Sequence, residues 1–474
     1  MQIENSIYEV AIVGGGISGT ALMYSLSNYT NINSIVLIEK NQEVAAANSH
    51  RTSNSQTLHF GDIETNYTLE KAQKVKKAAN LVKNYILRND PDQEIYSKYH
   101  KMVLAIGKEQ AEGLRERHKE FKSLFPELKL IEKEEIERFE PKVVENRALE
   151  EEILALFTEE GYTIDFQQLA QSFLHNSINN SDKSINLMTH TRVRSLKKEG
   201  ELYHIQTDKG SLVAKVVVFT AGPYSLLFAK SLGYGKDYAL LDVAGSFYIA
   251  PGVLNGKVYT VQLKQIPFAA IHGDAEVHDA SKTRFGPTAK VIPLLELRKY
   301  NTIFDYFRTA GLSVTALISF FNILSEKAIF KYIVKNYVYD IPLIGRRFFL
   351  KEAQKIVPSI QLGELRLAKG YGGIRPQIVN LKTKRLELGE AKIVGENILF
   401  NITPSPGAST CLQNAEYDTE KIISFLGEGY TFDKHRFLND LGDTQEVSVD
   451  QLNVNSEIKV SLEIPPSPCE GGKT

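Results

Sequence analysis

The apolar and polar positions of the first forty residues follow the pattern of a strand, a helix and a second strand. Residues 8–13 (YEVAIV) form a short apolar run, and residues 35–38 (IVLI) form another. Between them, three consecutive glycines are followed by apolar residues at helical spacing, Ala21, Leu22, Tyr24 and Leu26. The pattern therefore predicts one βαβ unit at the start of the chain.

The rest of the chain alternates between helical and strand-like patterns. Charged residues at helical spacing predict helices over about residues 69–90 and 108–137, and the apolar run at 216–219 (VVVF) predicts a buried strand. We expect short strands from about 153 to 215, strands with turns from about 235 to 300, helices from about 300 to 356, a strand at 398–402, a turn at 404–407 and a helix at 411–426. Pieces of a nucleotide-binding fold thus lie at the beginning, middle and end of the chain.

A glycine motif joins the first predicted strand to the first helix. Gly14, Gly16 and Gly19 have the spacing that allows a tight turn, close approach of a pyrophosphate and close packing of helix on strand. Glu39 lies 20 residues beyond Gly19, where its carboxylate would bind a ribose diol and repel the 2′-phosphate of NADP. The alternative, a glycine turn without a ligand, is disfavoured because strand, helix and acid are all in register.

Two further segments favour FAD over NAD as the cofactor. Residues 48–56 (NSHRTSNSQ) are small and polar, as hydrogen bonds to a ribityl chain require. Residues 403–409 (TPSPGAS) precede a helix whose first N–H groups would stabilise the negative charge of a reduced flavin, although a Ser- and Pro-rich helix cap is the alternative. The predicted FAD contacts are Gly14, Gly16, Gly19, Glu39, Lys40, Asn54, Ser55, Gln56, Val193, Ala221, Gly222, Gly373, Pro406, Gly407 and Ala408.

The fold class predicted from these segments is α/β, with a discontinuous Rossmann-like FAD-binding domain of the glutathione-reductase or D-amino-acid-oxidase type and an inserted α+β substrate domain. The FAD-binding domain is assigned to residues 1–80, 150–234 and 365–430, and the substrate or capping domain to residues 81–149 and 235–364. Residues 437–474 carry seven acidic and two basic residues and are expected to form an acidic tail.

The composition of the chain limits its possible binding partners and its cellular compartment. The chain of 474 residues is long enough for two or three domains, and its net charge of −1 argues against nucleic acid. Its two cysteines lack metal-ligand spacing, so we expect no metal site and a reducing compartment. The N-terminus lacks a signal-like leader, and the longest uncharged stretch, residues 309–325, is too short to span a bilayer. We expect a cytoplasmic protein with at most peripheral membrane contact.

The chain resembles a known family in motifs that occur in a consistent order over about residues 8–430. The segments GGGISGTALMYSL, NSQTLHFGDIETNYTLEKAQKVK, DVAGSFY, PFAAIHGD, TRFGPTA, GYGGIRPQ and NITPSPGASTCLQNAEYD look like the FAD-dependent malate:quinone oxidoreductases, especially their epsilonproteobacterial branch. This resemblance implies oxidation of (S)-malate to oxaloacetate, with electrons passing through FAD to a membrane quinone from a peripheral protein on the cytoplasmic face of the inner membrane. The L-2-hydroxyglutarate dehydrogenases are relatives in the same superfamily.

Oxidising a 2-hydroxy acid requires a base for the hydroxyl proton. His272 is the first choice, with Asp274 expected to orient the ring or favour its charged form, and His59 is the competitor. A histidine satisfied at a strand end is the alternative. The departures Leu263-Lys264-Gln265, Ala275-Glu276 and His50-Arg51 lie beside the expected site and bear on the substrate more than on the flavin.

A dicarboxylate substrate calls for guanidinium groups, which pair with carboxylates in bidentate fashion. Arg284 and Arg375 lie in turns flanked by Gly or Pro and are the predicted ligands, with an exposed turn arginine as the alternative for each. Tyr248 and Gln56 could add hydrogen bonds.

The segment from Lys327 to Lys355 contains seven basic and two acidic residues. Lys327, Lys331 and Lys335 recur every four residues and form one helical stripe, which would suit an anionic bilayer. A surface helix with its apolar side in the protein core is the favoured interpretation.

Three functions remain open from the residues alone. The first is malate oxidation with quinone as the acceptor, the second is oxidation of L-2-hydroxyglutarate or another 2-hydroxy acid, and the third is a redox-sensing flavoprotein without catalysis. Quinone and oxygen are not distinguished as acceptors by any residue.

Overall fold

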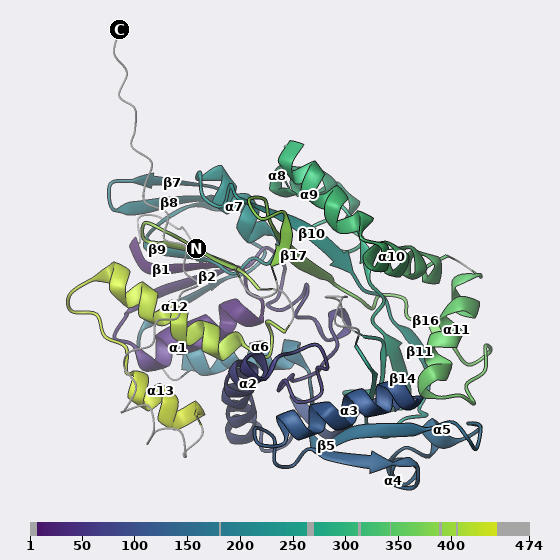
Figure 1. Cartoon of the computed structure of the whole chain (residues 1–474). Helices are drawn as coiled ribbons and strands as arrows, with labels where there is room; N and C mark the ends of the chain where they lie inside the picture. Colours follow the sequence, from purple (N-terminus) through teal and green to yellow (C-terminus); the bar gives the residue numbers. More distant parts are fainter. Residues whose placement is uncertain are drawn as a thin grey trace.

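The computed structural model describes residues 7–179, 182–262, 270–310, 314–341, 343–387, 391–403 and 406–442. Its first sheet has eight strands and a parallel centre in the order β6-β2-β1-β9-β20. Figure 1 labels β2, β1 and β9 of this centre. The parallel strands are β1 (Ile7–Val13), β2 (Ser34–Ile38), β6 (Ser184–Met188), β9 (Gly210–Phe219) and β20 (Ile398–Ile402). Antiparallel partners complete the sheet, namely β7 (Val193–Glu199) and β8 (Leu202–Thr207) beside β9, and β19 (Ala391–Gly395) beside β20.

One group of helices packs together beside this sheet. Helix α1 (Ile17–Tyr29), which follows the glycine turn, contacts α6 (Phe166–Asn179) and α12 (Cys411–Leu426). Because α1 is buried along almost its whole length, its small and apolar residues form the centre of the largest hydrophobic core. Helices α2 (Leu69–Asn89) and α13 (Lys434–Leu441) add to the same core.

A second, mixed sheet of eight strands forms a separate layer. Its order is β16-β11-β14-β13-β12-β3-β5-β4, so strands from three distant parts of the chain are neighbours. The strands are β3 (Tyr96–Ile106), β4 (Lys129–Glu132), β5 (Ile153–Ile164), β11 (Tyr248–Pro251), β12 (Lys257–Thr260), β13 (His272–Glu276), β14 (Asp279–Gly286) and β16 (Arg366–Leu367). Helices α3 (Lys108–Phe121), α4 (Lys133–Phe139) and α5 (Pro141–Val144) lie beside it (Figure 1).

A third sheet of four strands has the order β15-β10-β17-β18. The strands are β10 (Tyr238–Ala244), β15 (Lys290–Val291), β17 (Ile374–Asn380) and β18 (Arg385–Glu387). Its outer face packs against helices α9 (Val314–Ser325) and α10 (Lys327–Tyr339) through a small apolar core. The remaining helices are α7 (Tyr224–Ser231), α8 (Ile303–Ala310) and α11 (Gly345–Ile356), with single 3₁₀ turns at Arg51–Ser53 and Tyr300–Thr302.

Most elements expected from the pattern are present. The βαβ unit at the start, the helix at 411–426 and the helices between 300 and 356 agree with the expectation. Residues 108–137 differ, because α3 ends at Phe121 and β4 intervenes; Pro126 in the connection is incompatible with a continuous helix. Residues 404 and 405 of the predicted turn lie outside the described residues.

The domain boundaries remain a prediction, with two observations that bear on them. Strand β5, in the segment assigned to the FAD-binding domain, is hydrogen-bonded to β3 and β4 in the mixed sheet. At the other end, Phe437 and Leu441 are buried in the main core as part of α13, so the first residues of the expected acidic tail are helical. Residues 443–474 lie outside the described part.

In the described ranges, no single helix is long and apolar enough to cross a membrane. The segments Tyr300–Thr309 and Val314–Ser325 reach that length and apolarity only when taken together, and they are bent by 110° relative to each other.

Candidate active site

The glycine turn is held in a shape that side chains would disrupt. Gly14 has a φ of +113°, and a Cβ there would lie 2.7 Å from the carbonyl oxygen of Thr220. A Cβ on Gly19 would lie 2.0 Å from the carbonyl oxygen of Gly14. These glycines therefore serve the backbone geometry that was predicted for them, with β1, β9 and α1 in close contact.

Glu39 lies under this turn and is buried. Its carboxylate accepts hydrogen bonds from the Gly15 backbone N–H at 2.7 Å and from the backbone N–H and side-chain amide of Asn41 at 2.8 and 2.6 Å. The carboxylate thus fixes the glycine turn to the end of β2. Its predicted contact with a ribose remains a prediction.

A cavity of about 1100 Å³ opens at the carboxyl ends of β1, β2 and β9. This is the edge at which parallel α/β sheets bind nucleotides. Every predicted FAD contact except Gly19 and Gln56 lines it, namely Gly14, Gly16, Glu39, Lys40, Asn54, Ser55, Val193, Ala221, Gly222, Gly373, Pro406, Gly407 and Ala408. The structure therefore brings together segments that are almost 400 residues apart in the sequence.

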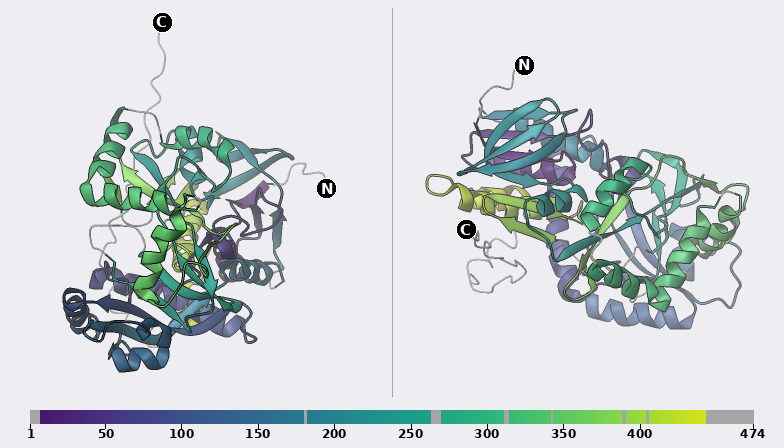
Figure 2. Two further views of the ribbon diagram at one scale, coloured as in Figure 1. Left: turned by 90° about the vertical axis from the view of Figure 1, so that its right-hand side faces the viewer. Right: turned by 90° about the horizontal axis from the view of Figure 1, so that it is seen from above.

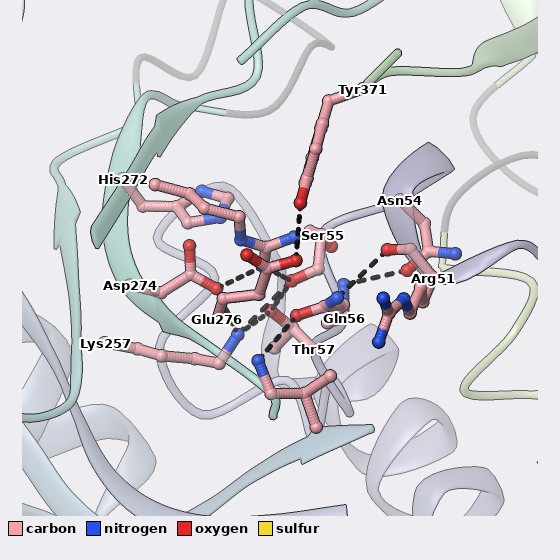
Figure 3. Close-up of polar contacts among 12 residues, drawn as sticks. Arg51, Asn54, Ser55, Gln56, Thr57, Lys257, His272, Asp274, Glu276 and Tyr371 are labelled. Carbon is pink, nitrogen blue, oxygen red and sulfur yellow. Dashed lines mark hydrogen bonds and ion pairs between the residues drawn. The ribbon is translucent and has the colours of Figure 1, made fainter. Parts of the chain in front are cut away.

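Gln56 has a different position from the predicted one. Its side chain is fully buried, its amide nitrogen donates to the Arg51 carbonyl at 3.0 Å, and its amide oxygen accepts from the Val277 N–H at 3.2 Å (Figure 3). Gln56 thus joins the polar 48–56 segment to the mixed sheet instead of lining the cavity. Tyr248 likewise uses its hydroxyl elsewhere, donating to the Tyr339 carbonyl at 2.6 Å.

Two of the four predicted catalytic residues line the cavity. His59 does so, and its Nδ1 lies 2.5 Å from Oε1 of Glu64. Burial alone would raise the pKa of Glu64, but the hydrogen bond and charge of His59, together with the charge of Lys101, lower it to about 2. The carboxylate is therefore ionised and orients the imidazole.

Arg375 also lines the cavity, on strand β17. Burial lowers the pKa of its guanidinium, which pairs with no carboxylate in the described ranges. A guanidinium stays charged even so, and an unpaired one at a cavity wall suits an anionic group.

Arg284 belongs to a row of charged residues on one face of the mixed sheet. Lys101, Lys257, Asp274 and Arg284 are direct cross-strand neighbours on β3, β12, β13 and β14, and all four are buried. Oδ2 of Asp274 accepts from Nζ of Lys257 at 2.9 Å and from Nη2 of Arg284 at 2.6 Å, and Figure 3 shows the contact between Lys257 and Asp274. Lys101 pairs with Asp62 at 2.9 Å. Among Lys257, Asp274 and Arg284, one anion thus faces two cations.

The pKa values follow from this arrangement. Burial would raise the pKa of Asp274, but the charges of Arg284 and Lys257 lower it to about 2. Burial lowers the pKa of Lys257 to about 8, with the charge of Asp274 opposing the shift. At neutral pH Lys257, Asp274 and Arg284 together carry two positive charges and one negative charge, all buried.

Several polar atoms in this row and in nearby His272 have no hydrogen-bond partner among the described residues. They are Nε and Nη1 of Arg284, Oδ1 of Asp274 and Nε2 of His272. A buried polar atom without a partner costs about 1–3 kcal/mol. Four such atoms in one cluster indicate a site for a polar ligand.

His272 is buried and uncharged. Its ring stacks on Tyr259 with centroids 4.5 Å apart, and burial lowers its pKa to about 3. No hydrogen bond from Asp274 orients this ring, because Oδ2 of Asp274 binds Lys257 and Arg284, and Nδ1 of His272 lies 3.4 Å from the Ala270 carbonyl. The charge of Asp274 raises the pKa of His272, as expected, but burial outweighs it. Residues 263–269, which include the departure Leu263-Lys264-Gln265, lie outside the described residues.

The charged row lies directly behind the cavity wall formed by Ser55 and Thr57. Nζ of Lys257 donates to the Thr57 hydroxyl at 3.0 Å and to the Ser55 carbonyl at 3.2 Å. The Tyr259 hydroxyl lies 2.8 Å from the same Thr57 hydroxyl. Polar contacts thus connect Lys257 and Tyr259 to the cavity wall, and His272 stacks on Tyr259.

Sequence reasoning did not identify Lys257, Lys101 or Glu64. A lysine in a strand is ordinarily expected to face solvent, and only the pairing of β12 with β3 and β13 brings Lys257 opposite Lys101 and Asp274. Of these three residues, only Glu64 could have been predicted from the sequence. It lies five residues after His59, and His and Glu in the same polar turn commonly pair.

Comparisons with known proteins agree with this geometry. A family model described as Malate:quinone oxidoreductase (Mqo) matches residues 6–416. The chain is 40% identical over 438 residues to a probable malate:quinone oxidoreductase of Campylobacter jejuni, with 90% of this chain and 98% of that protein covered. It is 24% identical over 433 residues to the human mitochondrial L-2-hydroxyglutarate dehydrogenase, with 86% and 87% covered.

The fold is also similar to that of solved flavoproteins. L-α-glycerophosphate oxidase from Mycoplasma pneumoniae, solved with FAD bound, has a TM-score of 0.62 at 17% identity, with 90% of this chain and 97% of that one covered. The predicted fold class is thereby confirmed.

Proposed function

Because the chain belongs to the malate:quinone oxidoreductase family, we propose that it oxidises (S)-malate to oxaloacetate with FAD as cofactor and a quinone as electron acceptor. The family resemblance noted from the sequence motifs is confirmed. L-2-hydroxyglutarate is disfavoured as the substrate, because identity to that dehydrogenase is 24% against 40% for the malate:quinone relative.

The cavity fits a flavin dinucleotide. Its volume of about 1100 Å³ exceeds the usual 300–1,000 Å³ of small-ligand sites. Gly14 and Gly16 would lie against the pyrophosphate at the start of α1, and Pro406, Gly407 and Ala408 would lie near the flavin ring. When bound, the flavin supplies the acceptor for the hydride that leaves C2 of malate.

Substrate binding is assigned to Arg284 and Arg375. The single observation that carries the proposal is that Arg284 is fully buried, with Nε and Nη1 unpartnered among the described residues. A substrate carboxylate would accept a charge-assisted hydrogen bond from Nε or from Nη1. Arg375 on the cavity wall would bind the second carboxylate of a four-carbon diacid.

His272 is proposed as the base that takes the hydroxyl proton. It is neutral, as a base must be, and its Nε2 is free among the described residues. The negative charges of a bound diacid would raise its low pKa towards the working pH, so that its basicity increases when the substrate is present. His59, oriented by Glu64 on the cavity wall, is the competing base.

A quinone acceptor implies contact with a bilayer, since such quinones dissolve in lipid. We assign the protein to the cytoplasmic face of the membrane, as a peripheral protein. Membership of the malate:quinone oxidoreductase family is what supports this assignment.

The test is anaerobic titration of the purified protein with (S)-malate, L-2-hydroxyglutarate and L-lactate, following loss of the flavin absorbance. Malate should reduce the flavin fastest. L-2-Hydroxyglutarate is the control for chain length, and L-lactate is the control for the second carboxylate. Colourless protein that does not take up added FAD, or faster reduction by L-2-hydroxyglutarate, would overturn the proposal.

A further inference from the structure

Large apolar side chains are exposed over one group of helices. In the described ranges nineteen such side chains are exposed, and fourteen of them lie between Tyr300 and Phe348, on α8–α11 and their connections. The most exposed include Leu343 at 90%, Val314 at 73%, Phe304 at 72% and Phe321 at 71%. Scattered exposed residues need no explanation, but a concentration of this kind marks an interaction surface.

These exposed side chains lie on the opposite side of the helices from the protein core. Ile323, Ile329 and Ile333 face inward and pack with Val379 against the four-stranded sheet, as the favoured interpretation of α10 requires. Phe321 and Phe330, on the same two helices, point away from that core. The outer face is therefore both apolar and basic. Interpreting α10 as a surface helix with its apolar side in the core did not predict the exposed apolar residues. Figure 2 (left) shows these green helices on the side turned towards the viewer.

Five basic residues lie among the apolar ones. Lys327, Lys331, Arg346, Arg347 and Lys351 are exposed, and none of them pairs with a carboxylate in the described part of the chain. The neighbouring Lys335 and Lys355 both pair with Glu352, at 2.6 and 3.0 Å. The surface thus carries unpaired positive charge although the whole chain has a net charge of −1.

We infer that this surface, the outer face of α8–α11, docks on an anionic lipid bilayer. Aromatic and aliphatic side chains would enter the region between headgroups and acyl chains, while the five cations would contact lipid phosphates. A second copy of the chain is a poorer occupant, because a twofold contact through this surface would bring two sets of unpaired cations together.

The inference deepens the proposed function, since it identifies the surface that would bring the protein to a lipid-soluble acceptor. The inference rests on the proposed function only for the identity of the electron acceptor. Lipid binding itself follows from the exposed side chains and is measured without substrate.

The experiment is co-sedimentation of the full-length, flavin-loaded protein with vesicles of phosphatidylcholine alone or with about 30 mol% phosphatidylglycerol, a composition chosen to span neutral and anionic surfaces. The wild type should bind the anionic vesicles and bind the neutral ones more weakly. Phe321→Ser with Phe330→Ser should lower the partition coefficient by about tenfold for each side chain. Lys327→Gln with Lys331→Gln should lower it by about thirtyfold, at about 1 kcal/mol for each basic residue.

Matched controls use exposed residues away from the surface. Leu87→Ser on α2 removes a side chain that is 48% exposed, and Lys119→Gln with Lys122→Gln at the end of α3 removes two exposed lysines. These variants should bind like the wild type. Flavin content and turnover with a water-soluble dye should be unchanged in all variants, which shows that they are folded.

The outcomes separate the two proposals. Equal binding by the surface variants and the wild type, or no binding by the wild type, overturns the docking surface. Concentration-dependent dimers that the surface variants abolish, with no lipid binding, overturn it in favour of self-association. Lipid binding without malate turnover in the dye assay leaves the docking surface supported and refutes the proposed reaction.

Discussion

Replacing Arg284 with methionine tests the proposed substrate site most directly. The guanidinium has two donors, Nε and Nη1, without partners among the described residues, while Nη2 binds Asp274 at 2.6 Å. A charge-assisted hydrogen bond contributes about 1.5–3 kcal/mol, and a substrate carboxylate can accept one from Nε or from Nη1. At about 1.4 kcal/mol for each factor of ten, kcat/KM for malate should fall by about 10- to 100-fold.

The fold should tolerate this change. Asp274 keeps Nζ of Lys257 at 2.9 Å, so its buried carboxylate retains a cation, and methionine fills a similar volume beside Phe247. The assay is the rate of flavin reduction by malate and by L-lactate, and the preference for malate should shrink. Arg366→Met, an exposed arginine on β16 of the same sheet, is the control.

The reasoning fails if the Arg284→Met variant retains its flavin and kcat/KM for malate stays within about threefold of the wild-type value. Should that variant lose flavin, Arg284→Lys serves instead, since it keeps a positive charge beside Asp274 but lacks the fork of donors. The lysine variant should still lose at least about tenfold in kcat/KM.

Three further predictions follow from the geometry. Gly14→Ala should abolish flavin binding and lower the free energy of unfolding by about 1–3 kcal/mol, because φ is +113° and a Cβ would meet the Thr220 carbonyl. Gly113→Ala, in an open position on α3, is the control and should raise the free energy of unfolding by about 0.5–1 kcal/mol. Flavin content and thermal melting check both variants. The KM for malate should rise above about pH 8 as Lys257 loses its proton, and Lys257→Arg should remove that rise; a wild-type profile that is flat to about pH 9.5 would contradict the assignment. His272→Gln should retain flavin but slow its reduction by malate by about 10²-fold or more, while His59→Gln should do so by less; the reverse order would make His59 the base.

The parts of the fold and site that the sequence predicts are those set by local chemistry. A tight turn is predicted almost entirely by Gly14, Gly16 and Gly19, which lie between an apolar run and a helical pattern. Glu39, at a fixed distance from them, marks the end of the second strand, where its carboxylate binds the turn. Most of the small and polar residues of the 48–56 and 406–408 segments line the cavity, as their composition predicts.

The rest depends on tertiary contacts that no local pattern encodes. Lys257 and Asp274 are paired only because β12 and β13 are adjacent, and that pairing takes Oδ2 of Asp274 away from His272. Gln56 was placed at the cofactor by its neighbours, but the αL backbone conformation of this residue, with a φ of +54°, turns its side chain into the sheet. Burial decides the charge of His272, and burial is a property of the whole molecule.

The interleaved order of the first sheet also bears on synthesis in the cell. Gly14, Gly16 and the 406–408 segment line one cavity, so the cofactor depends on two segments that are almost 400 residues apart in the sequence. At about 5–20 residues per second, a ribosome needs about 20–80 s to travel from Gly19 to Ala408. The cradle is therefore incomplete until Ala408 has been synthesised, so loading with dinucleotide follows translation of the 406–408 segment.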